Sequence, residues 1–259
     1  MKIKLKIAVN KNVFDEMGTF WAEIADQSQT ERQVEFLKNM LQPKGLVLDL
    51  ACGTGRHLIA LGKEGYGVVG LDISLKLLKI AKNRWREAQM VQADMRFLPF
   101  KSQAFSAATS MDQSFGYLPS GLDDLRSLIE LHWALGRGGV LIVDVFNREH
   151  LIKRGSASSQ PKWREYPNFY LQQKRTVAAN GEKLCDLWVV HDKADGQVRV
   201  FEHVASLYTP SGLRSMLTKA DFKVQAVYGD YEMQDFSVVS SRLIMVATSC
   251  HYHSCRPFF

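Results

Sequence analysis

Short apolar segments alternate with amphipathic segments between residues 30 and 146 of this 259-residue chain. The apolar segments, such as residues 46–50 and 140–146, lack the polar alternation of a strand with one solvated face, which is typical of parallel strands covered on both sides. The amphipathic segments carry apolar residues at helical spacing. Strands that alternate with helices in this way predict an α/β protein with a parallel sheet between two layers of helices.

Capping and turn residues set the boundaries of these elements. In the first helix, residues 30–41, Thr30 is placed to cap the N-terminus with Gln33 reaching back, and Pro43 and Gly45 follow its end. The sequence GRGG predicts a turn before the strand at residues 140–146. The other expected elements of this part are strands at 67–72, 90–94 and 104–111, helices that begin at Arg56 and Ser74, and a helix at 122–135.

The pattern changes after residue 146. Residues 147–165 are polar and predict irregular structure, and three strand-like segments follow, separated by the turn sequences AANGE and ADGQ. Short connections between consecutive strands predict a small antiparallel meander, which we interpret as an insertion. A helix at 209–222, with Thr209 as its cap and Pro210 at its first position, then restores the first pattern. The remaining expected strands are 169–178, 183–193 and 197–208 in the meander, and 223–231 and 242–249 after it.

The N-terminus begins with alternating apolar and basic residues. Ile3, Leu5, Ile7 and Val9 alternate with lysines, which predicts a short edge strand protected by charge rather than a secretory signal. An arm that contacts a membrane or RNA is the alternative. The whole pattern predicts four regions. They are an N-terminal arm or cofactor lid (1–29), a core (30–146 and 209–249), an antiparallel β insertion that acts as a substrate cap (147–208) and a tail (250–259).

Composition narrows the class of protein. The chain is 46% hydrophobic and 23% charged, and no apolar segment approaches the ~18 residues of a membrane helix. Its net charge of +6 is spread along the sequence, so we expect neither a nucleic-acid module nor a membrane partner. Four unevenly spaced cysteines suit a reducing cytoplasm. The tail sequence CHYHSC at 250–255 offers metal ligands, but ligands so close together cannot easily surround one ion, and we expect no metal site.

The sequence LDLACGTGRHL, residues 48–58, indicates a ligand site. Gly53 and Gly55 bare the backbone where a strand ends, and the helix after them presents unpaired N–H groups to the same place. The next strand ends in Asp72, which is placed to accept hydrogen bonds from two ribose hydroxyls, and the third ends in Asp94, which is placed to accept from an adenine amino group. A Gly-x-Gly sequence alone is weak evidence for a nucleoside site, and the acids that end the next two strands make that evidence strong.

Two ligand classes fit such a site, a dinucleotide and S-adenosylmethionine. The dinucleotide motif has a third glycine where this chain has Leu58. Asp49, just before the loop, would repel a pyrophosphate and attract the ammonium of a methionyl group. The residues therefore favour an amino acid joined to a nucleoside.

The segments LDLACGTGRHL, VVGLDIS, QADMRFLPF, SFGYL and LGRGGVLIVDVFN together resemble the class I S-adenosylmethionine-dependent methyltransferases. The resemblance covers about Thr30 to Ser249 and is strongest to the small-molecule-type branch with an antiparallel insertion after the fifth strand, which includes sugar N,N-dimethyltransferases. It implies a Rossmann-like, doubly wound, mostly parallel seven-stranded sheet. The usual Phe-Asp at the start of the fourth strand is Phe105-Ser106 here. The cofactor-binding residues that it implies are Asp49, Ala51, Gly53 and Gly55 around the methionyl part, Asp72 and Ile73 at ribose and adenine, Asp94 and Met95 at the adenine edge, and Met111 as a wall.

Each of these acids also has a structural interpretation. Asp49 could cap the loop, and Asp94 could begin a turn before Pro99. Cap formation at the helix after Asp72 needs only Ser74, which favours a ligand role for Asp72. Cys52 is interpreted as a small loop residue and not as a nucleophile.

Acceptor chemistry is less defined by the sequence. Tyr117 and His203 are the candidate catalytic residues, although a core position is an equal alternative for His203. Neighbouring candidates are Asp112 and Gln113, which are expected near the methyl group with Tyr117, and Tyr208, which is expected with His203 where the meander returns to the core. The other candidates are Trp163, Arg164 and Tyr166 as a lid, and Phe20 and Trp21 as a cover over the cofactor or a hydrophobic staple.

We therefore expect in-line methyl transfer from S-adenosyl-L-methionine to a nitrogen or oxygen of a small molecule, with S-adenosyl-L-homocysteine as product. A chain of this kind is compatible with a homodimer. RNA or protein methylation, a nicotinamide-dependent oxidoreductase and a non-catalytic relative are the alternatives. MDQSFGY lacks the Asn/Asp-Pro-Pro-Tyr/Phe stretch common in amino methylation of nucleobases.

Overall fold

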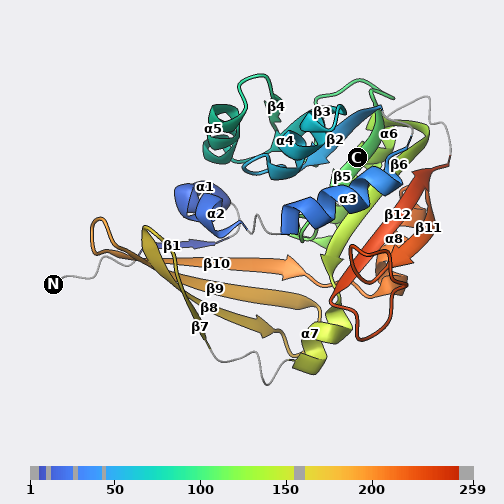
Figure 1. Cartoon of the computed structure of the whole chain (residues 1–259). Helices are drawn as coiled ribbons and strands as arrows, with labels where there is room; N and C mark the ends of the chain where they lie inside the picture. Colours follow the sequence, from blue (N-terminus) through green and yellow to red (C-terminus); the bar gives the residue numbers. More distant parts are fainter. Residues whose placement is uncertain (1–5, 10–12, 26–28, 43–44, 155–160, 251–259) are drawn as a thin grey trace.

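The computed structural model of the chain describes residues 6–9, 13–25, 29–42, 45–154 and 161–250 and contains two sheets (Figure 1). The larger sheet has seven strands in the order β11-β12-β6-β5-β2-β3-β4. The five neighbouring strands β6, β5, β2, β3 and β4 pair in parallel. Strand β12 is antiparallel to both of its neighbours, β11 and β6. The mostly parallel seven-stranded sheet expected from the sequence is confirmed. Its strands are β2 (Leu46–Leu50), β3 (Gly67–Asp72), β4 (Gln89–Gln92), β5 (Phe105–Ser110), β6 (Leu135–Phe146), β11 (Phe222–Tyr228) and β12 (Arg242–Ser249).

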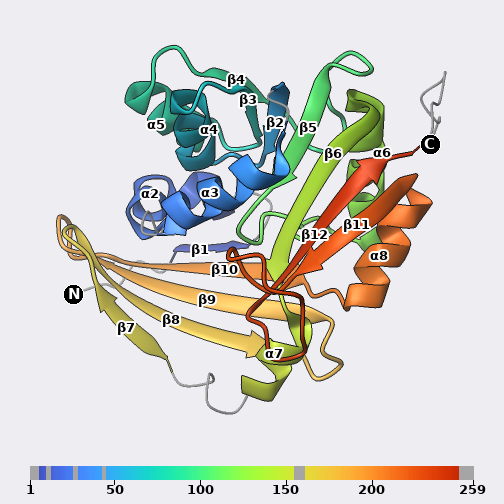
Figure 2. The same ribbon diagram turned by 45° about the vertical axis from the view of Figure 1, so that its right-hand side comes forward.

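Helices cover both faces of this sheet (Figure 2). Because successive side chains of a strand point to opposite faces, β2 sends Leu48 and Leu50 into one core and Val47 into the other. The first core also holds apolar residues of α6 and α8, and the second those of α3 and α4. The sheet therefore lies between two layers of helices, as predicted. The helices are α3 (Thr30–Met40), α4 (Arg56–Lys63), α5 (Leu75–Arg84), α6 (Gly121–Ala134) and α8 (Pro210–Lys219).

The smaller sheet has five strands in the order β1-β10-β9-β8-β7 and contains the predicted meander. Its inner face packs on two short N-terminal helices through Met17, Phe169 and Phe201. The N-terminal strand pairs in parallel with β10 at the edge of the sheet, so the expected edge strand is confirmed over the residues that are described. The elements are β1 (Lys6–Val9), α1 (Val13–Met17), α2 (Thr19–Ile24), β7 (Lys162–Glu165), β8 (Phe169–Val177), β9 (Lys183–Asp192) and β10 (Val198–Ser206).

The prediction of irregular structure over residues 147–165 was wrong in two places. Helix α7 (Arg148–Arg154) and strand β7 lie there. Neither element has a buried residue, so neither has the apolar periodicity from which an element can be recognised in a sequence.

Two local predictions were also wrong. Gln33 does not cap α3; its side chain is buried and donates a hydrogen bond to the Tyr231 hydroxyl at 2.8 Å, and the capping position is Gln29. The GRGG segment is not a turn before β6 but part of the strand, whose pairing with β5 shifts register between Phe105 and Ala107. The extra residues are accommodated as an irregularity of the strand pair. By contrast, Thr209 Oγ1 accepts from the backbone N–H of Gly212 at 3.0 Å, which confirms the cap of α8.

Leu58, at the position of the third dinucleotide glycine, is fully buried against β3. Gly70 of that strand makes room for it, because a Cβ there would lie 2.5 Å from Leu58 Cδ1 and 2.7 Å from Cys52 Sγ. The glycine that permits close packing of helix and strand is thus on the strand in this chain and on the helix in a dinucleotide-binding motif.

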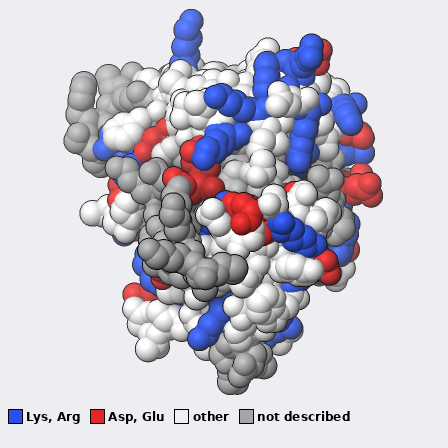
Figure 3. All heavy atoms as spheres, turned by 90° about the vertical axis from the view of Figure 1, so that its left-hand side faces the viewer, with Lys and Arg blue, Asp and Glu red and all other residues white. Residues whose placement is uncertain are grey.

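One face of the molecule carries charges of both signs. Figure 3 shows basic and acidic side chains interspersed on one face of the molecule. No helix among the described residues is long and apolar enough to cross a membrane. Within the same part of the chain, His, Cys, Asp and Glu residues form no group of three that could hold a metal ion, and the tail from residue 251 lies outside the described residues.

Candidate functional site: two adjoining cavities

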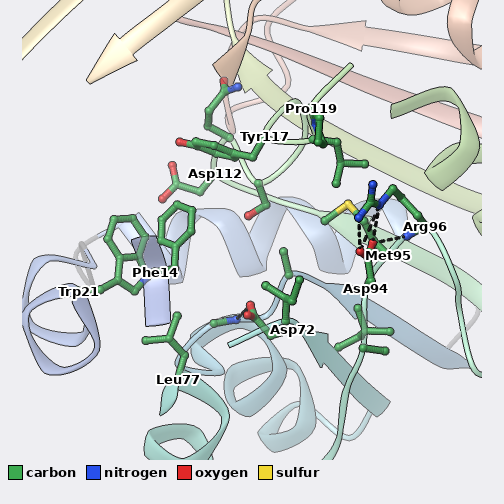
Figure 4. Close-up of a pocket in the computed structure, with 18 residues that line it drawn as sticks. Phe14, Trp21, Asp72, Leu77, Asp94, Met95, Arg96, Asp112, Tyr117 and Pro119 are labelled. Atoms are coloured by element: carbon green, nitrogen blue, oxygen red, sulfur yellow. Dashed lines mark hydrogen bonds and ion pairs between the residues drawn. The ribbon is translucent and has the colours of Figure 1, made fainter. Parts of the chain in front are cut away.

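A cavity of about 540 Å³ lies at the carboxyl ends of the parallel strands (Figure 4). This is the edge of an open α/β sheet where ligands bind. Of the cofactor residues expected from the sequence, six line it: Ala51, Gly53, Asp72, Ile73, Asp94 and Met95. Asp49, Gly55 and Met111 lie behind the wall of the cavity.

The glycine loop forms the floor of this cavity. Gly53 adopts a φ of 53°, and a Cβ added there would make only ordinary contacts with two residues that line the cavity, at 3.8 Å from Trp21 Nε1 and 3.9 Å from Leu77 Cδ1. A ligand can therefore approach the backbone at this residue. Gly55 has a φ of 75° and serves packing, since its Cβ would lie 3.0 Å from that of Ala81 in α5. Ala51 has a φ of 56°, a sparsely populated conformation that is concentrated at functional sites.

Asp72 is fixed by the backbone around it. Its Oδ2 accepts from the N–H of Gly53 and its Oδ1 accepts from the N–H of Ser74, each at 2.8 Å. The carboxylate is 7% exposed, and burial raises its pKa above the usual value. Each carboxylate oxygen can accept a second hydrogen bond, so Asp72 can hold the loop and bind two ligand hydroxyls at once.

Asp49 is buried beneath the loop, with 1% of its surface exposed. Burial raises its pKa to about 7, against the opposing charge of Arg56. Its Oδ2 makes no hydrogen bond with any described residue. A buried carboxylate oxygen without a donor is costly, and a cationic ligand group at the loop would lower that cost.

Asp94 has a partner that the sequence did not reveal. Arg96 Nη2 lies 2.6 Å from Asp94 Oδ2 (Figure 4). Arg96 Nη1 also lies 3.0 Å from Asp123 Oδ1. Partial burial is the largest single effect and acts against ionisation of Asp94, but the hydrogen bonds and the charge of Arg96 together outweigh it and hold the pKa of Asp94 below its usual value. Arg96 also lines the cavity. Asp94 is thus a fixed anion whose oxygens already accept from a guanidinium.

The N-terminal arm closes the other side of the cavity. Phe14 of α1 and Trp21 of α2 line it, with their ring centroids 5.2 Å apart (Figure 4). Asp15 fastens this arm to α5, because its Oδ1 accepts from Ser74 Oγ at 2.9 Å and from the N–H of Lys76 at 3.1 Å. Phe20 does not face the cavity and packs on Phe169 of the small sheet.

A second cavity, of about 480 Å³, lies between the two sheets and shares Trp21, Asp112, Gln113 and Tyr117 with the first. His203 lies in its wall with an aromatic ring on each of several sides, at centroid distances of 4.9 Å to both Phe14 and Trp188. The structure therefore brings together the candidate residues Tyr117 and His203, whose centroids are 6.4 Å apart.

His203 and Tyr117 at this junction are electrically neutral near pH 7. Burial lowers the pKa of His203 to about 4, and its Nε2 makes no hydrogen bond with a described residue. Burial also raises the pKa of Tyr117 well above its usual value, so the side chain remains a phenol. Asp112, at a φ of 55°, is held by Arg56 at 2.7 Å. None of the three is arranged as a strong general base.

Of the remaining residues that the sequence suggested for acceptor binding, only some line a cavity. Arg164 lines the second cavity, whereas Trp163 is 59% exposed and Tyr166 stacks on Phe169 at 4.6 Å. Tyr208 lies away from both cavities and donates a hydrogen bond to Asp124.

The first cavity suits an adenosyl group that carries an amino acid. Apolar side chains such as Ile73 and Leu77 can cover a purine, Asp72 offers two acceptors for ribose, and Gly53 allows close approach. The unpartnered Oδ2 of Asp49 fits the cationic end of a methionyl group better than a pyrophosphate. Fold and site together define a nucleoside-binding α/β protein with an adjoining cavity for a second molecule.

Comparison with known proteins identifies the class further. Residues 47–139 match the family model described as a methyltransferase domain. Glycine/sarcosine N-methyltransferase of Parasynechococcus marenigrum is 34% identical over 154 residues, which cover 56% of this chain and 55% of that protein. The putative methyltransferase YqeM of Bacillus subtilis is 24% identical over 91% of this chain and 96% of its own length. The chain thus spans about half the length of the first relative and nearly all of the second.

Among solved structures, the CcbJ methyltransferase from Streptomyces caelestis has the same fold, with a TM-score of 0.79 at 16% identity over 93% of this chain and 99% of that one. Residues 47–139 are therefore similar to a methyltransferase domain, and the chain as a whole has the fold of the CcbJ methyltransferase. The residues of the first cavity fit S-adenosyl-L-methionine, the methyl donor that the sequence predicts.

Proposed function

We propose that the chain transfers a methyl group from S-adenosylmethionine to the nitrogen of a small-molecule amine. The observation that carries this proposal is the contact between the two cavities at Trp21, Asp112, Gln113 and Tyr117. One cavity fits the adenosyl and methionyl parts, and the other opens from the place where a transferable methyl group would lie. The cofactor supplies an activated methyl group on a sulfonium.

The residues of the chain then have three tasks. Asp72 and the Gly53 loop hold the nucleoside, and Asp49 orients the amino-acid end. Phe14 and Trp21 keep water from the junction, because the in-line displacement needs a desolvated and oriented nucleophile.

The absence of a strong base at the junction, among the described residues, favours nitrogen over oxygen as the acceptor atom. A hydroxyl would need deprotonation, but Tyr117 remains a phenol and His203 has a pKa of about 4. An amine needs only to be neutral, and burial among aromatic rings lowers the pKa of an ammonium. Tyr117 and the neutral imidazole of His203 are then left to position the amine. The relative in Parasynechococcus marenigrum is named as an N-methyltransferase, which supports the same choice.

The test is incubation of the protein with methyl-tritiated S-adenosylmethionine and fractionated metabolite, RNA and protein pools. We expect label in a metabolite, on an amine nitrogen by mass spectrometry, and at least tenfold less label with the Asp72→Ala variant at a cofactor concentration below saturation. Label on an oxygen would refute the choice of nitrogen, and label confined to RNA or protein would refute a small-molecule acceptor. A protein that binds the cofactor and labels no pool would be a non-catalytic relative.

A further inference from the structure

The second cavity has an uneven charge distribution. Four acids line it, and each already has a partner among the described residues. Asp112 is paired with Arg56, Asp186 with Arg175 at 2.6 Å, and Glu232 with Arg32. The fourth, Asp230, accepts from the N–H of Glu232 at 3.0 Å and of Gln234 at 3.1 Å.

Three cations of the same cavity have no such partner. Arg154, Lys162 and Arg164 line it, and none forms an ion pair with a carboxylate of the described residues. All three side chains are exposed, so they form the rim of the cavity while the aromatic residues around His203 form its inner end. We call Arg154, Lys162 and Arg164 the basic rim.

The local structure of β7 turns two of these cations toward the cavity. Residues two apart in a strand share a face, so Lys162 and Arg164 point to one side and Trp163 and Glu165 to the other. Glu165 has its partner, Lys193, on that other side at 2.8 Å. Arg154 comes from the last turn of α7 and adds the third charge.

We infer that the basic rim binds a phosphate or pyrophosphate group of the methyl acceptor, while the amine of the same molecule reaches the aromatic inner end. Two guanidinium groups and an ammonium supply many charge-assisted donors, which match an anion with several oxygens. The inference rests on the proposed function and narrows it to phosphorylated amines or amines joined to a nucleoside diphosphate. The alternative is that these cations only protect β7, an edge strand, from pairing with another chain.

The probe is inorganic pyrophosphate, titrated by calorimetry into protein saturated with S-adenosylhomocysteine at low ionic strength. The rim variant carries Arg154→Gln, Lys162→Gln and Arg164→Gln. The matched control carries Lys174→Gln, Arg214→Gln and Lys223→Gln, which remove the same net charge from exposed positions outside both cavities. We expect the wild type and the control to bind pyrophosphate, with phosphate weaker and acetate weakest, and the rim variant to lose at least tenfold in affinity.

Equal losses in both variants, or no pyrophosphate binding by the wild type, would overturn the inference in favour of edge protection. Acetate binding as tightly as pyrophosphate would also overturn it. Affinity for S-adenosylhomocysteine should be the same in all three proteins. If the wild type fails to bind S-adenosylhomocysteine, the proposed function fails, and the pyrophosphate titration, repeated without it, still tests the rim. As a second readout, tritium-labelled product should be retained on an anion-exchange column at pH 8, and labelled product that flows through would contradict an anionic acceptor.

Discussion

At the scale of single residues, the site depends on two buried carboxylates with different surroundings. Asp72 accepts two backbone N–H groups and keeps acceptor sites for a ligand, whereas Asp49 has an oxygen with no donor among the described residues. The first arrangement fixes the loop and, in our proposal, also binds the ligand. The second reduces stability and is retained, in our account, because it binds a cation.

Replacement of Asp72 by alanine should weaken S-adenosylmethionine binding at least tenfold. Two ribose hydrogen bonds of about 1–1.5 kcal/mol each are lost. Calorimetry measures the affinity. Chemical denaturation of the same sample checks that the variant still folds without the hydrogen bonds that Asp72 accepts from Gly53 and Ser74. A folded variant with unchanged affinity would remove Asp72 from the site.

Replacement of Asp49 by asparagine should raise stability and lower affinity. Burial raises the pKa of Asp49 from 3.8 to about 7, so the folded state holds the proton more tightly than the unfolded state. This group therefore destabilises the wild type as pH rises from about 4 to 7, and the penalty is constant above 7. At pH 8 the variant should be more stable by on the order of 2–4 kcal/mol, a gain that shrinks toward zero at pH 4.

The same variant should bind S-adenosylhomocysteine at least tenfold more weakly at pH 8, since the ammonium loses its counter-charge. Urea denaturation between pH 4 and 8 and calorimetry give the two quantities. A variant that is no more stable at pH 8 than the wild type, or that binds as well, would contradict the assigned role.

The motif reveals some of these residues and hides others. Asp72 and Gly53 could be predicted because strand ends and a bare backbone have recognisable sequences. Arg96 could not, since its bonds to Asp94 and Asp123 depend on how a turn meets α6. Gln33 has the spacing of a capping residue, but its burial beside Tyr231, at a great distance in sequence, decides its role.

At the scale of elements, the N-terminal helices connect the two cavities to the core. Helix α1 is fastened to the N-terminus of α5 through Asp15, and it carries Phe14 into both the cavity wall and the ring of aromatic residues around His203. A short helix of this kind derives its stability from such tertiary contacts.

Replacement of Asp15 by alanine should weaken S-adenosylhomocysteine binding about three- to tenfold, mainly through faster dissociation. Both hydrogen bonds from α5 to Asp15 are exposed or half-buried, which limits the free energy that they contribute to holding α1 in place. Stopped-flow dissociation measures the rate, and Glu87→Ala, an exposed acid outside both cavities, is the control. Equal dissociation rates in the two variants would show that α1 is not a cover for the cofactor.

Most elements of the core could be predicted because they bury apolar faces with regular periods. The errors fall where burial is missing or interrupted. Helix α7 and strand β7 bury no residue, and the GRGG segment of β6 reads as a turn although its backbone continues the strand. Sequence periodicity carries no signal in such segments.

At the scale of the whole molecule, two sheets from separate parts of the sequence enclose the junction between the cavities. The N-terminal strand β1 joins the sheet of the insertion by parallel pairing with β10. This pairing joins segments nearly 200 residues apart, as in Lys6 with Arg199, and no local pattern predicts it. We therefore propose that the N-terminal arm and the insertion form one wall of the acceptor cavity.

Removal of the insertion, from about Asn147 to Tyr208, should abolish acceptor turnover, because the wall that carries His203 and Trp188 is lost. Binding of S-adenosylhomocysteine should weaken as well, since α1 and α2 lose their packing surface. A methyl-transfer assay with the acceptor pool is the measurement, and a variant with intact turnover would contradict the assignment of acceptor choice to the insertion.

The most direct measurement of the central claim is a calorimetric comparison of two ligands, S-adenosylhomocysteine and NAD, on the wild-type protein. The account predicts that S-adenosylhomocysteine binds and raises the melting temperature, as any ligand of the native state does, while NAD does neither. Binding of NAD with no response to S-adenosylhomocysteine would contradict it, because a pyrophosphate would then be accepted beside Asp49.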